Sequence, residues 1–379
     1  MTPGRWRARV IVAVVAVSLT AACGGGGGSD DPGAVASGGS GCIPASDPLV
    51  AAARQEGTVV MSGPPDANVR QKLPAAFEEA YGVPVDYIGT GGSDNAARLR
   101  SERQAGIYSQ DVFLGGGETM ANTYAASNWL APLTDVLPAD TLAGAQWRGG
   151  KVPFVDPNSR ILKISEYVAL PLVINTDLVK PGEISTWKDL LDPKWRGKIA
   201  MIDPRRSGGA VYNVGMFLAD AGYGESFVQQ LYHDQQPVLL TESRQGVDDV
   251  ARGKYPIGIA FGQADVDTAM ADKLPIEVVV PDLLQVTSGF GFLAVADKMP
   301  HPNAGKLLAS WLACQGGNAV WNDAYGSIST RTDVTPAADT PKWQVPDPAV
   351  KYFNASSWEF LSGGRNAATE KVKSVIGAG

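Results

Sequence analysis

The sequence predicts an α/β protein of two lobes, each a mixed, mostly parallel sheet flanked by helices, with a ligand cleft between the lobes. Strand-like apolar runs alternate with helical patterns, which is typical of parallel sheets covered on both faces. The same sequence pattern also occurs once in each half of the chain, at residues 94–117 and 244–262. In it, a helix ends at glycine and is followed by a strand that ends at glycine. The chain is also too long for one compact core.

The first 41 residues are predicted to lie outside the fold. Three arginines precede the uncharged run Val10–Leu19, which is too short to cross a bilayer and indicates a secretory signal over residues 1–22. Cys23 follows two alanines, as at a bacterial lipoprotein cleavage site, so we expect it to be lipidated. The alternative is a plain signal peptide with an incidental cysteine. Residues 23–41 have almost nothing to bury and predict a flexible tether on the outer face of the cytoplasmic membrane.

Charge and cysteine content narrow the possible partners. The formal net charge is −7, and it becomes −10 once the three arginines of the signal are removed. An acidic chain argues against a nucleic-acid partner. Cys42 and Cys314 remain as an even pair in an exported chain, so we expect a disulfide between them. Two free thiols are the alternative, since sequence does not show proximity.

The elements follow from local patterns. Apolar runs bounded by glycine or polar turns predict the strands, and apolar residues at helical spacing predict the helices, as in the helix that is capped by Ser207, carries apolar residues from Ala210 onward and ends by Gly222. The later half returns to the first lobe near Val286–Val295. Lobe 1 is therefore placed at residues 42–117 plus about 283–335, and lobe 2 at about 118–282 plus the C-terminal helices, 336–379. The expected strands are 58–61, 85–88, 111–114, 199–202 and 257–261, and the expected helices include 94–105, 244–252 and 304–313.

The candidate ligand site lies at the strand ends. In open parallel sheets, ligands bind beyond the carboxyl ends of the strands. There the sequence is mostly small, polar or glycine, and two serines are expected to cap helices whose N-termini favour an anion. Two arginines add donors suited to carboxylate or phosphate, and we expect one of them to point inward. The alternative is an ordinary capped helix with solvated arginines. The expected ligand-binding residues are Ser62, Thr90, Gly91, Gly92, Ser93 (a cap), Glu118, Arg205, Arg206, Ser207 (a cap), Gly208, Gly209, Tyr212 and Gln263.

The stretch Thr186–Pro204 resembles the extracellular solute-binding proteins of ABC importers, in the ferric-iron, thiamine and phosphonate-like group. Further segments of this resemblance follow in order, from about residue 51 to residue 332: Gln55–Met61, Phe77–Val85, Ala97–Phe113 and Pro302–Ala304. The resemblance implies a type II periplasmic-binding-protein fold that closes by hinge motion around a small molecule. It also implies delivery of that ligand to a membrane permease driven by a separate ATPase, and we expect a monomer.

The residues favour an anionic ligand. Ferric-binding members of the family often use two adjacent tyrosines, but no two of the eleven tyrosines here are adjacent, and Tyr212 is the best-placed single phenol. A thiamine-like ligand would need stacked aromatic rings, which the predicted cleft loops supply poorly. We therefore expect a small organic anion, namely an organophosphate, phosphonate or carboxylate, with no metal and no cofactor. Ferric iron and thiamine remain the alternatives.

Enzyme activity is not expected. Ser185–Lys188 and Ser93–Asn95 match two motifs of penicillin-interacting serine enzymes, but their order is reversed and the third motif is missing. With only His233 and His301, a histidine triad or a zinc cluster is poorly supplied. A lipid-anchored cell-wall serine hydrolase and a surface adhesin remain the alternatives from other functional classes.

Overall fold

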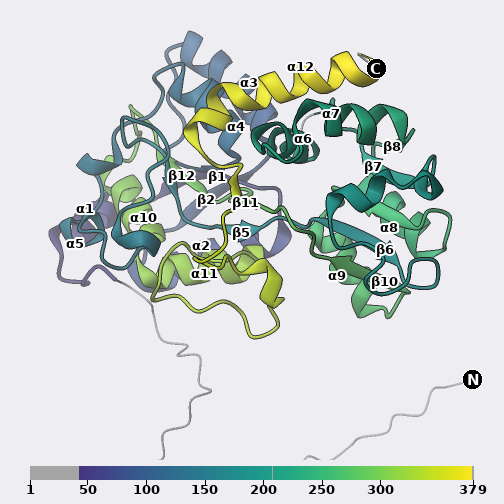
Figure 1. The fold of residues 1–379 in the computed structure, drawn as a ribbon. Helices are drawn as coiled ribbons and strands as arrows, with labels where there is room; N and C mark the ends of the chain where they lie inside the picture. Colours follow the sequence, from purple (N-terminus) through teal and green to yellow (C-terminus); the bar gives the residue numbers. More distant parts are fainter. Residues whose placement is uncertain (1–41, 207, 378–379) are drawn as a thin grey trace, which may run out of the picture. The chain divides into compact units, whose positions relative to one another are not determined.

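The computed structural model describes residues 42–206 and 208–377, and it contains two five-stranded sheets, each with its own hydrophobic core (Figure 1). The predictions for the signal, for lipidated Cys23, for the tether and for Ser207 fall outside these residues. Within the described residues, no helix has both the length and the hydrophobicity needed to cross a membrane.

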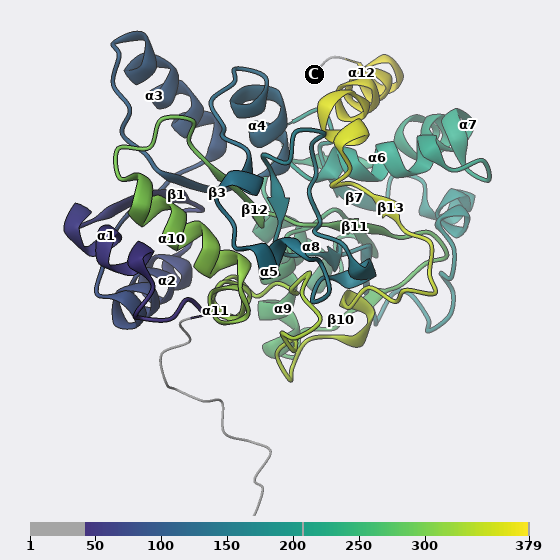
Figure 2. The same cartoon turned by 90° about the vertical axis from the view of Figure 1, so that its left-hand side faces the viewer.

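The first lobe is built on the sheet β2–β1–β3–β12–β4, in which β1 is parallel to β2 and β3, whereas β12 is antiparallel to β3 and β4. Helices α1 and α10 pack against each other beside this sheet (Figure 2). Phe77, Trp311 and Trp321 are fully buried in the core. The elements are β1 (Val59–Gly63), β2 (Val85–Gly89), β3 (Val112–Gly115), β4 (Leu162–Lys163), β12 (Phe292–Val295), α1 (Pro48–Glu56), α2 (Ala67–Tyr81), α3 (Gly92–Gln104), α4 (Gly117–Thr119), α5 (Ala139–Leu142), α10 (Pro302–Ala313) and α11 (Gln315–Tyr325).

The second lobe is built on the sheet β10–β6–β9–β7–β8, in which β7 is parallel to β8 and β9, and β6 is antiparallel to β9 and β10. Trp187 and Phe217 meet edge to face, with ring centroids 5.1 Å apart, in its core. The elements are β6 (Leu172–Asn175), β7 (Ile199–Ile202), β8 (Val238–Leu240), β9 (Ile257–Ile259), β10 (Ile276–Val279), α6 (Ala210–Ala219), α7 (Gly224–Gln229), α8 (Ser243–Ala251) and α9 (Gln263–Ala271). The predicted strands and helices therefore form, with ends shifted by one or two residues.

A third sheet joins the lobes. β5 (Tyr167–Val168) lies between β4 and β6 along the chain, and β11 (Gln285–Thr287) lies between β10 and β12, so these two antiparallel strands carry the chain across and back. β13 (Phe353–Asn354) pairs in parallel with β11 and adds a third strand. Such short crossing strands are where a hinge between the lobes would absorb its rotation.

The predicted lobe boundary at residue 117 is too early. The helical turn Met120–Ala125 packs in a core of the first lobe, Leu130 bridges Ala296, and β4 pairs with β12. The physical reason is that β12 and β4 extend the first sheet beyond β3, so the chain continues in this lobe until β4 is complete.

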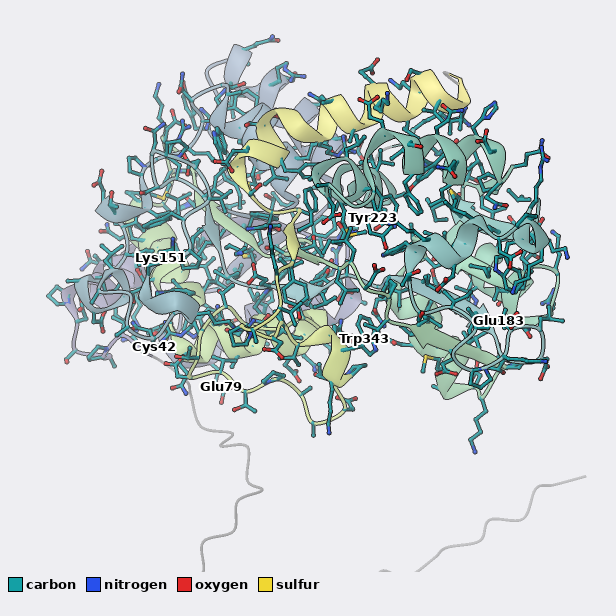
Figure 3. All side chains as sticks on the ribbon, viewed as in Figure 1. Cys42, Glu79, Lys151, Glu183, Tyr223 and Trp343 are labelled. Atoms are coloured by element: carbon teal, nitrogen blue, oxygen red, sulfur yellow. A yellow bond between two sulfur atoms is a disulfide. The ribbon has the colours of Figure 1, made fainter. Side chains whose placement is uncertain are left out.

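The C-terminal residues contact both lobes rather than the second alone. Phe360 packs in the core of the second lobe and its neighbour Leu361 in a core of the first, where the Leu361 carbonyl accepts a hydrogen bond of 2.9 Å from Asn122. Trp343, earlier in this segment, packs against a second-lobe cluster (Figure 3). Helix α12 (Arg365–Ile376) then packs on α6, as Figure 1 shows in yellow. The C-terminal segment therefore links the two cores.

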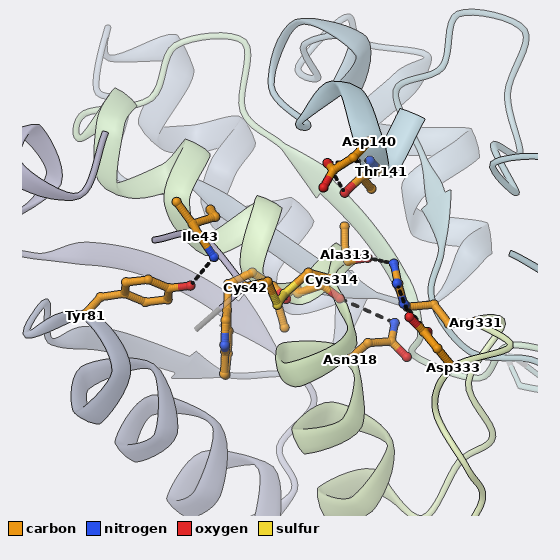
Figure 4. The surroundings of a disulfide bond; sticks show 12 residues. Cys42, Ile43, Tyr81, Asp140, Thr141, Ala313, Cys314, Asn318, Arg331 and Asp333 are labelled. Atoms are coloured by element: carbon orange, nitrogen blue, oxygen red, sulfur yellow. Dashed lines mark hydrogen bonds and ion pairs between the residues drawn. A yellow bond between two sulfur atoms is a disulfide. The ribbon is translucent and has the colours of Figure 1, made fainter. Parts of the chain in front are cut away.

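Cys42 and Cys314 form the expected disulfide, with their Cα atoms 6.1 Å apart (Figure 4). The bond joins the start of the described chain to the end of α10, 272 positions later. Next to it, the backbone N–H of Ile43 donates to the Tyr81 hydroxyl at 3.2 Å. The disulfide thus fixes the point where the chain enters the first lobe.

Candidate functional site

A pocket lies at the carboxyl ends of β1, β2 and β3, where the sequence predicts the first-lobe half of the site. Its cavity volume is about 20 Å³, or about 280 Å³ when the space open to solvent is included, and three predicted residues, Ser62, Thr90 and Gly92, line it. The remaining lining combines small groups with aromatic and aliphatic side chains: Gly63, Asn95, Phe113, Leu114, Gly115, Gly116, Thr119, Met120, Tyr124 and Phe290. The pocket is therefore polar enough to orient a ligand and apolar enough to exclude water from part of it.

A buried amide network orients two hydroxyls of this pocket. The Nδ2 of Asn95 donates to Ser62 Oγ at 3.1 Å, to Tyr124 Oη at 2.9 Å and to Gln110 Oε1 at 3.2 Å. The Nε2 of Gln110 donates back to Asn95 Oδ1 at 2.8 Å, which fixes the amide orientation. Asn95 Nδ2 carries two protons, so with one donated to Gln110 the hydroxyls of Ser62 and Tyr124 share the other. Neither hydroxyl donates in these bonds, so each retains its own O–H proton for another partner.

Tyr124 remains a donor at physiological pH. Burial raises the pKa of Tyr124 to about 12, and the hydrogen bond from Asn95 only partly opposes this rise. Asn95, Gln110 and Ser62 are themselves at most 4% exposed, so the network is protected from water. The pocket thus presents hydroxyl donors, which suit a ligand with anionic oxygen acceptors.

The N-terminus of α3 lies beside these hydroxyls. The predicted cap at Ser93 is wrong, because the N-cap is Gly91 and Ser93 is an exposed residue inside the first turn. At the first position of the helix, a Cβ on residue 92 would stand 2.5 Å from the Thr119 hydroxyl, which favours glycine there. No side chain caps α3. Its first N–H groups are therefore available to an acceptor in the pocket.

The predicted second-lobe arginine Arg205 is engaged elsewhere. Its guanidinium forms a two-pronged pair with Asp203, with Nε–Oδ1 at 2.9 Å and Nη2–Oδ2 at 2.7 Å, and Nη1 donates to the Gly377 carbonyl at 3.2 Å. Gly377 follows α12, whose twelve residues span about 18 Å, and the other end of that helix is the one that contacts the first lobe. Arg205 therefore lies about one helix length from Arg365, at the end of α12 that is remote from the first-lobe contact.

The other predicted ligand-binding residues described in the second lobe lie at the starts of α6 and α9. Arg206, Gly208 and Gly209 are exposed, and Gly209 rather than Ser207 occupies the N-cap position of α6. Gln263 begins α9 and donates to Asp267 Oδ1 at 2.7 Å one turn along the same helix, so its amide is engaged outside the pocket lining. The contacts of these residues thus do not connect them to the first-lobe pocket.

Arg365, which the sequence did not single out, links Tyr212 and Glu118. Arg365, the first residue of α12, donates from Nη1 to Glu118 Oε1 at 2.7 Å and also interacts with the Tyr212 hydroxyl. Burial raises the pKa of Tyr212, with Arg365 opposing the rise. Glu118 belongs to α4, Tyr212 to α6 and Arg365 to the C-terminal segment, so this cluster brings both lobes together next to the pocket.

Sequence patterns also did not identify four residues that line the pocket, Asn95, Thr119, Tyr124 and Phe290. Asn95 and Thr119 each follow a glycine pair at a strand end, which is a signal that the sequence did carry. Tyr124 and Phe290 carry no local signal, because only the fold brings them to the pocket.

Two α/β lobes, strands that cross between them and a polar pocket at the strand ends define a ligand-binding protein of the periplasmic type. The comparisons establish the family. The family model for bacterial extracellular solute-binding proteins matches residues 62–319, and the chain belongs to this family. It is the solute-binding component of an ABC importer, has the type II periplasmic-binding-protein fold, and captures a small solute outside the membrane for delivery to the permease.

Known proteins similar to this chain include an uncharacterised protein of Haemophilus influenzae, 25% identical over 318 residues, which cover 79% of this chain and 83% of that protein. Among solved structures, the periplasmic binding protein AfuA of Actinobacillus pleuropneumoniae with fructose-6-phosphate bound has a TM-score of 0.62 at 19% identity, covering 84% of this chain and 98% of AfuA. Iron-bound HitA of Pseudomonas aeruginosa has a TM-score of 0.63 at 16% identity, covering 84% and 99%. At these identities the structures bear on the fold alone.

Proposed function

We propose that the transported solute is a small organic anion, an organophosphate, phosphonate or carboxylate, and that its anionic group binds at the first-lobe pocket. The observation that carries this proposal is the Asn95 network, because it leaves Ser62 and Tyr124 as hydroxyl donors. Thr90 and the uncapped N-terminus of α3 at Gly91 and Gly92 add donors at the same strand ends. Positive potential at a helix N-terminus also favours a negative ligand.

Ferric iron is the second candidate, because Tyr167 and Tyr212 interact with each other near the lobe interface. Phenolates are hard anionic donors for a hard cation. Burial, with a smaller contribution from Tyr212, raises the pKa of Tyr167 to about 12, so a ferric ion would have to displace the proton of this phenol. The related structures contain examples of both ligand classes, since AfuA holds fructose-6-phosphate and HitA holds iron.

The remaining features of the proposed function follow from the sequence. The protein acts as a monomer, has no catalytic activity, and is held on the outer face of the cytoplasmic membrane by lipid on Cys23. Replacing Cys23 by serine should then release the protein from the membrane fraction.

A thermal-shift screen of the purified protein tests the ligand class. The compounds are fructose 6-phosphate, inorganic phosphate, phosphonates, citrate, thiamine and ferric salts. A binding anion at a hundredfold excess over its Kd should stabilise the protein by about 2.7 kcal/mol. Ser62→Ala should weaken that binding about fivefold, the value of one hydrogen bond. Stabilisation by thiamine or by ferric iron but by none of the anions would refute the proposal.

A further inference from the structure

Arg365 is a buried cation whose partners satisfy it incompletely. Its side chain is 7% exposed, and its bond to Glu118 uses Nη1 alone. Among the described residues, its Nε is buried without a hydrogen-bond partner. Glu118 is 40% exposed, so water competes for the carboxylate while the guanidinium stays largely desolvated. A buried charge normally requires fuller pairing, and an unsatisfied buried donor in a native protein calls for an explanation.

Two sets of neighbouring residues connect Arg365 to the pocket. In the first set, Glu118 lies on α4 between Gly116 and Thr119, both of which line the pocket. The segment leading to Arg365 lies over the same helix, since a Cβ on Gly117 would stand 2.7 Å from Leu361.

The second set of neighbouring residues includes Tyr167 of β5, one of the strands that cross between the lobes. Phe290, which lines the pocket, follows Gly289, and a Cβ on Gly289 would stand 2.6 Å from the Tyr167 hydroxyl. Tyr212 contributes to the raised pKa of Tyr167, and Arg365 opposes the rise in the pKa of Tyr212. The Tyr212 ring also packs edge to face on Phe360, five positions before Arg365, with ring centroids 5.5 Å apart. The guanidinium therefore lies between Glu118 of the first lobe and Tyr212 of the second lobe, next to the helix that separates it from the pocket lining.

We propose that Arg365, rather than Arg205 or Arg206, is the charged partner of the bound anion, and that Glu118 holds its guanidinium until the anion replaces it. The proposal rests on the proposed function, since it assumes an anionic solute in this pocket. Arginine suits the role because its fork of donors can bind a carboxylate or phosphate with two hydrogen bonds. Glu118 would then compete with the ligand for the same group.

This competition predicts opposite effects of two substitutions. Arg365→Gln should weaken anion binding about thirtyfold to several thousandfold, the usual cost of removing one member of a buried charge pair. Glu118→Gln should strengthen binding roughly twofold to fivefold, because it removes the internal competitor. Arg205→Gln is the matched control, since it also breaks an arginine–carboxylate pair but lies far from the pocket, and it should leave affinity unchanged.

The experiment is isothermal titration of the four full-length proteins with fructose 6-phosphate, inorganic phosphate and citrate, with circular dichroism and melting to verify folding. Opposite signs for the two substitutions support the proposal. Equal affinity in Arg365→Gln and the parent refutes it while leaving the anionic solute intact. Weaker binding in Glu118→Gln also refutes it, because that result indicates an ion pair that only holds the lobes together. If Arg365→Gln does not fold, the sign of the Glu118→Gln effect decides. An absence of binding of all three anions to the parent refutes both proposals.

Discussion

Replacing Asn95 by alanine tests whether the amide network serves the ligand or only the fold. Asn95 is 3% exposed and Gln110 2% exposed, and the substitution removes both hydrogen bonds that join their amides. Each polar group left unsatisfied in the interior costs about 1–3 kcal/mol, so we expect the free energy of unfolding to fall by about 2–4 kcal/mol. Ser62 and Tyr124 also lose the donor that orients them, which should weaken anion binding about fivefold for each hydroxyl.

The assay pairs urea denaturation with calorimetric titration of the best-binding anion from the screen. Asn318→Ala is the matched control, because Asn318 is another fully buried asparagine of the first lobe and donates to the Ile164 and Leu312 carbonyls away from the pocket. Both variants should lose stability, but only Asn95→Ala should also lose affinity. A variant Asn95→Ala that is destabilised yet binds like the parent would show that the network is structural, and the reasoning for the anion would fail.

Three further predictions concern stability. Replacing Cys42 and Cys314 together by serine should lower the free energy of unfolding by up to about 5 kcal/mol, since the bond closes a 272-position loop, and denaturation without reductant that gives the parent's midpoint would contradict this. Asp111→Ala should cost about 3–5 kcal/mol in the same assay, because its fully buried carboxylate accepts hydrogen bonds of 2.7 to 2.9 Å from one backbone N–H in β1 and another at the start of α10. For Asp203, burial raises the pKa but the hydrogen bonds from Arg205 outweigh it, so the pKa lies below its usual value of about 3.9. Its contribution is therefore present above about pH 4 and is lost as the pH falls below that value, so the stability difference between the parent and Asp203→Asn should vanish in acid and persist at pH 7.

The sequence predicted most of the elements because their signals are local. Apolar spacing identified α6, although the expected cap at Ser207 placed its start two residues before Ala210, and it located β7 at Ile199–Ile202. The lobe boundary failed because it depends on a long-range pairing. β4 joins β12 about 130 positions later, and nothing in the two residues Leu162–Lys163 marks them as the far strand of a sheet.

The pocket at the strand ends was predictable for a similar reason. Ser62 lies near the end of β1, Thr90 and Gly92 follow β2, and parallel strands bring their carboxyl ends to one edge. Ser93 was assigned as a cap because serine favours that position. The glycine pair before it allows α3 to start earlier, and the close approach of α4 then favours glycine at residue 92.

The proposed charged partner, Arg365, is a residue that local sequence patterns could not identify. Arg205 and Arg206 looked suitable because they lie at a strand end before a helix, but Asp203, two positions earlier, satisfies Arg205 within its own turn. An arginine that binds an anion in a closing cleft must instead be desolvated and incompletely paired. Desolvation depends on burial, and burial is a property of the whole fold. Arg365 meets that condition: it is buried, and its pair with Glu118, 247 positions away in the sequence, leaves Nε without a partner among the described residues. Arg365 itself lies on α12, a helix that the sequence assigned to the second lobe alone. The environment that makes Arg365 the proposed partner is therefore one that only tertiary structure creates.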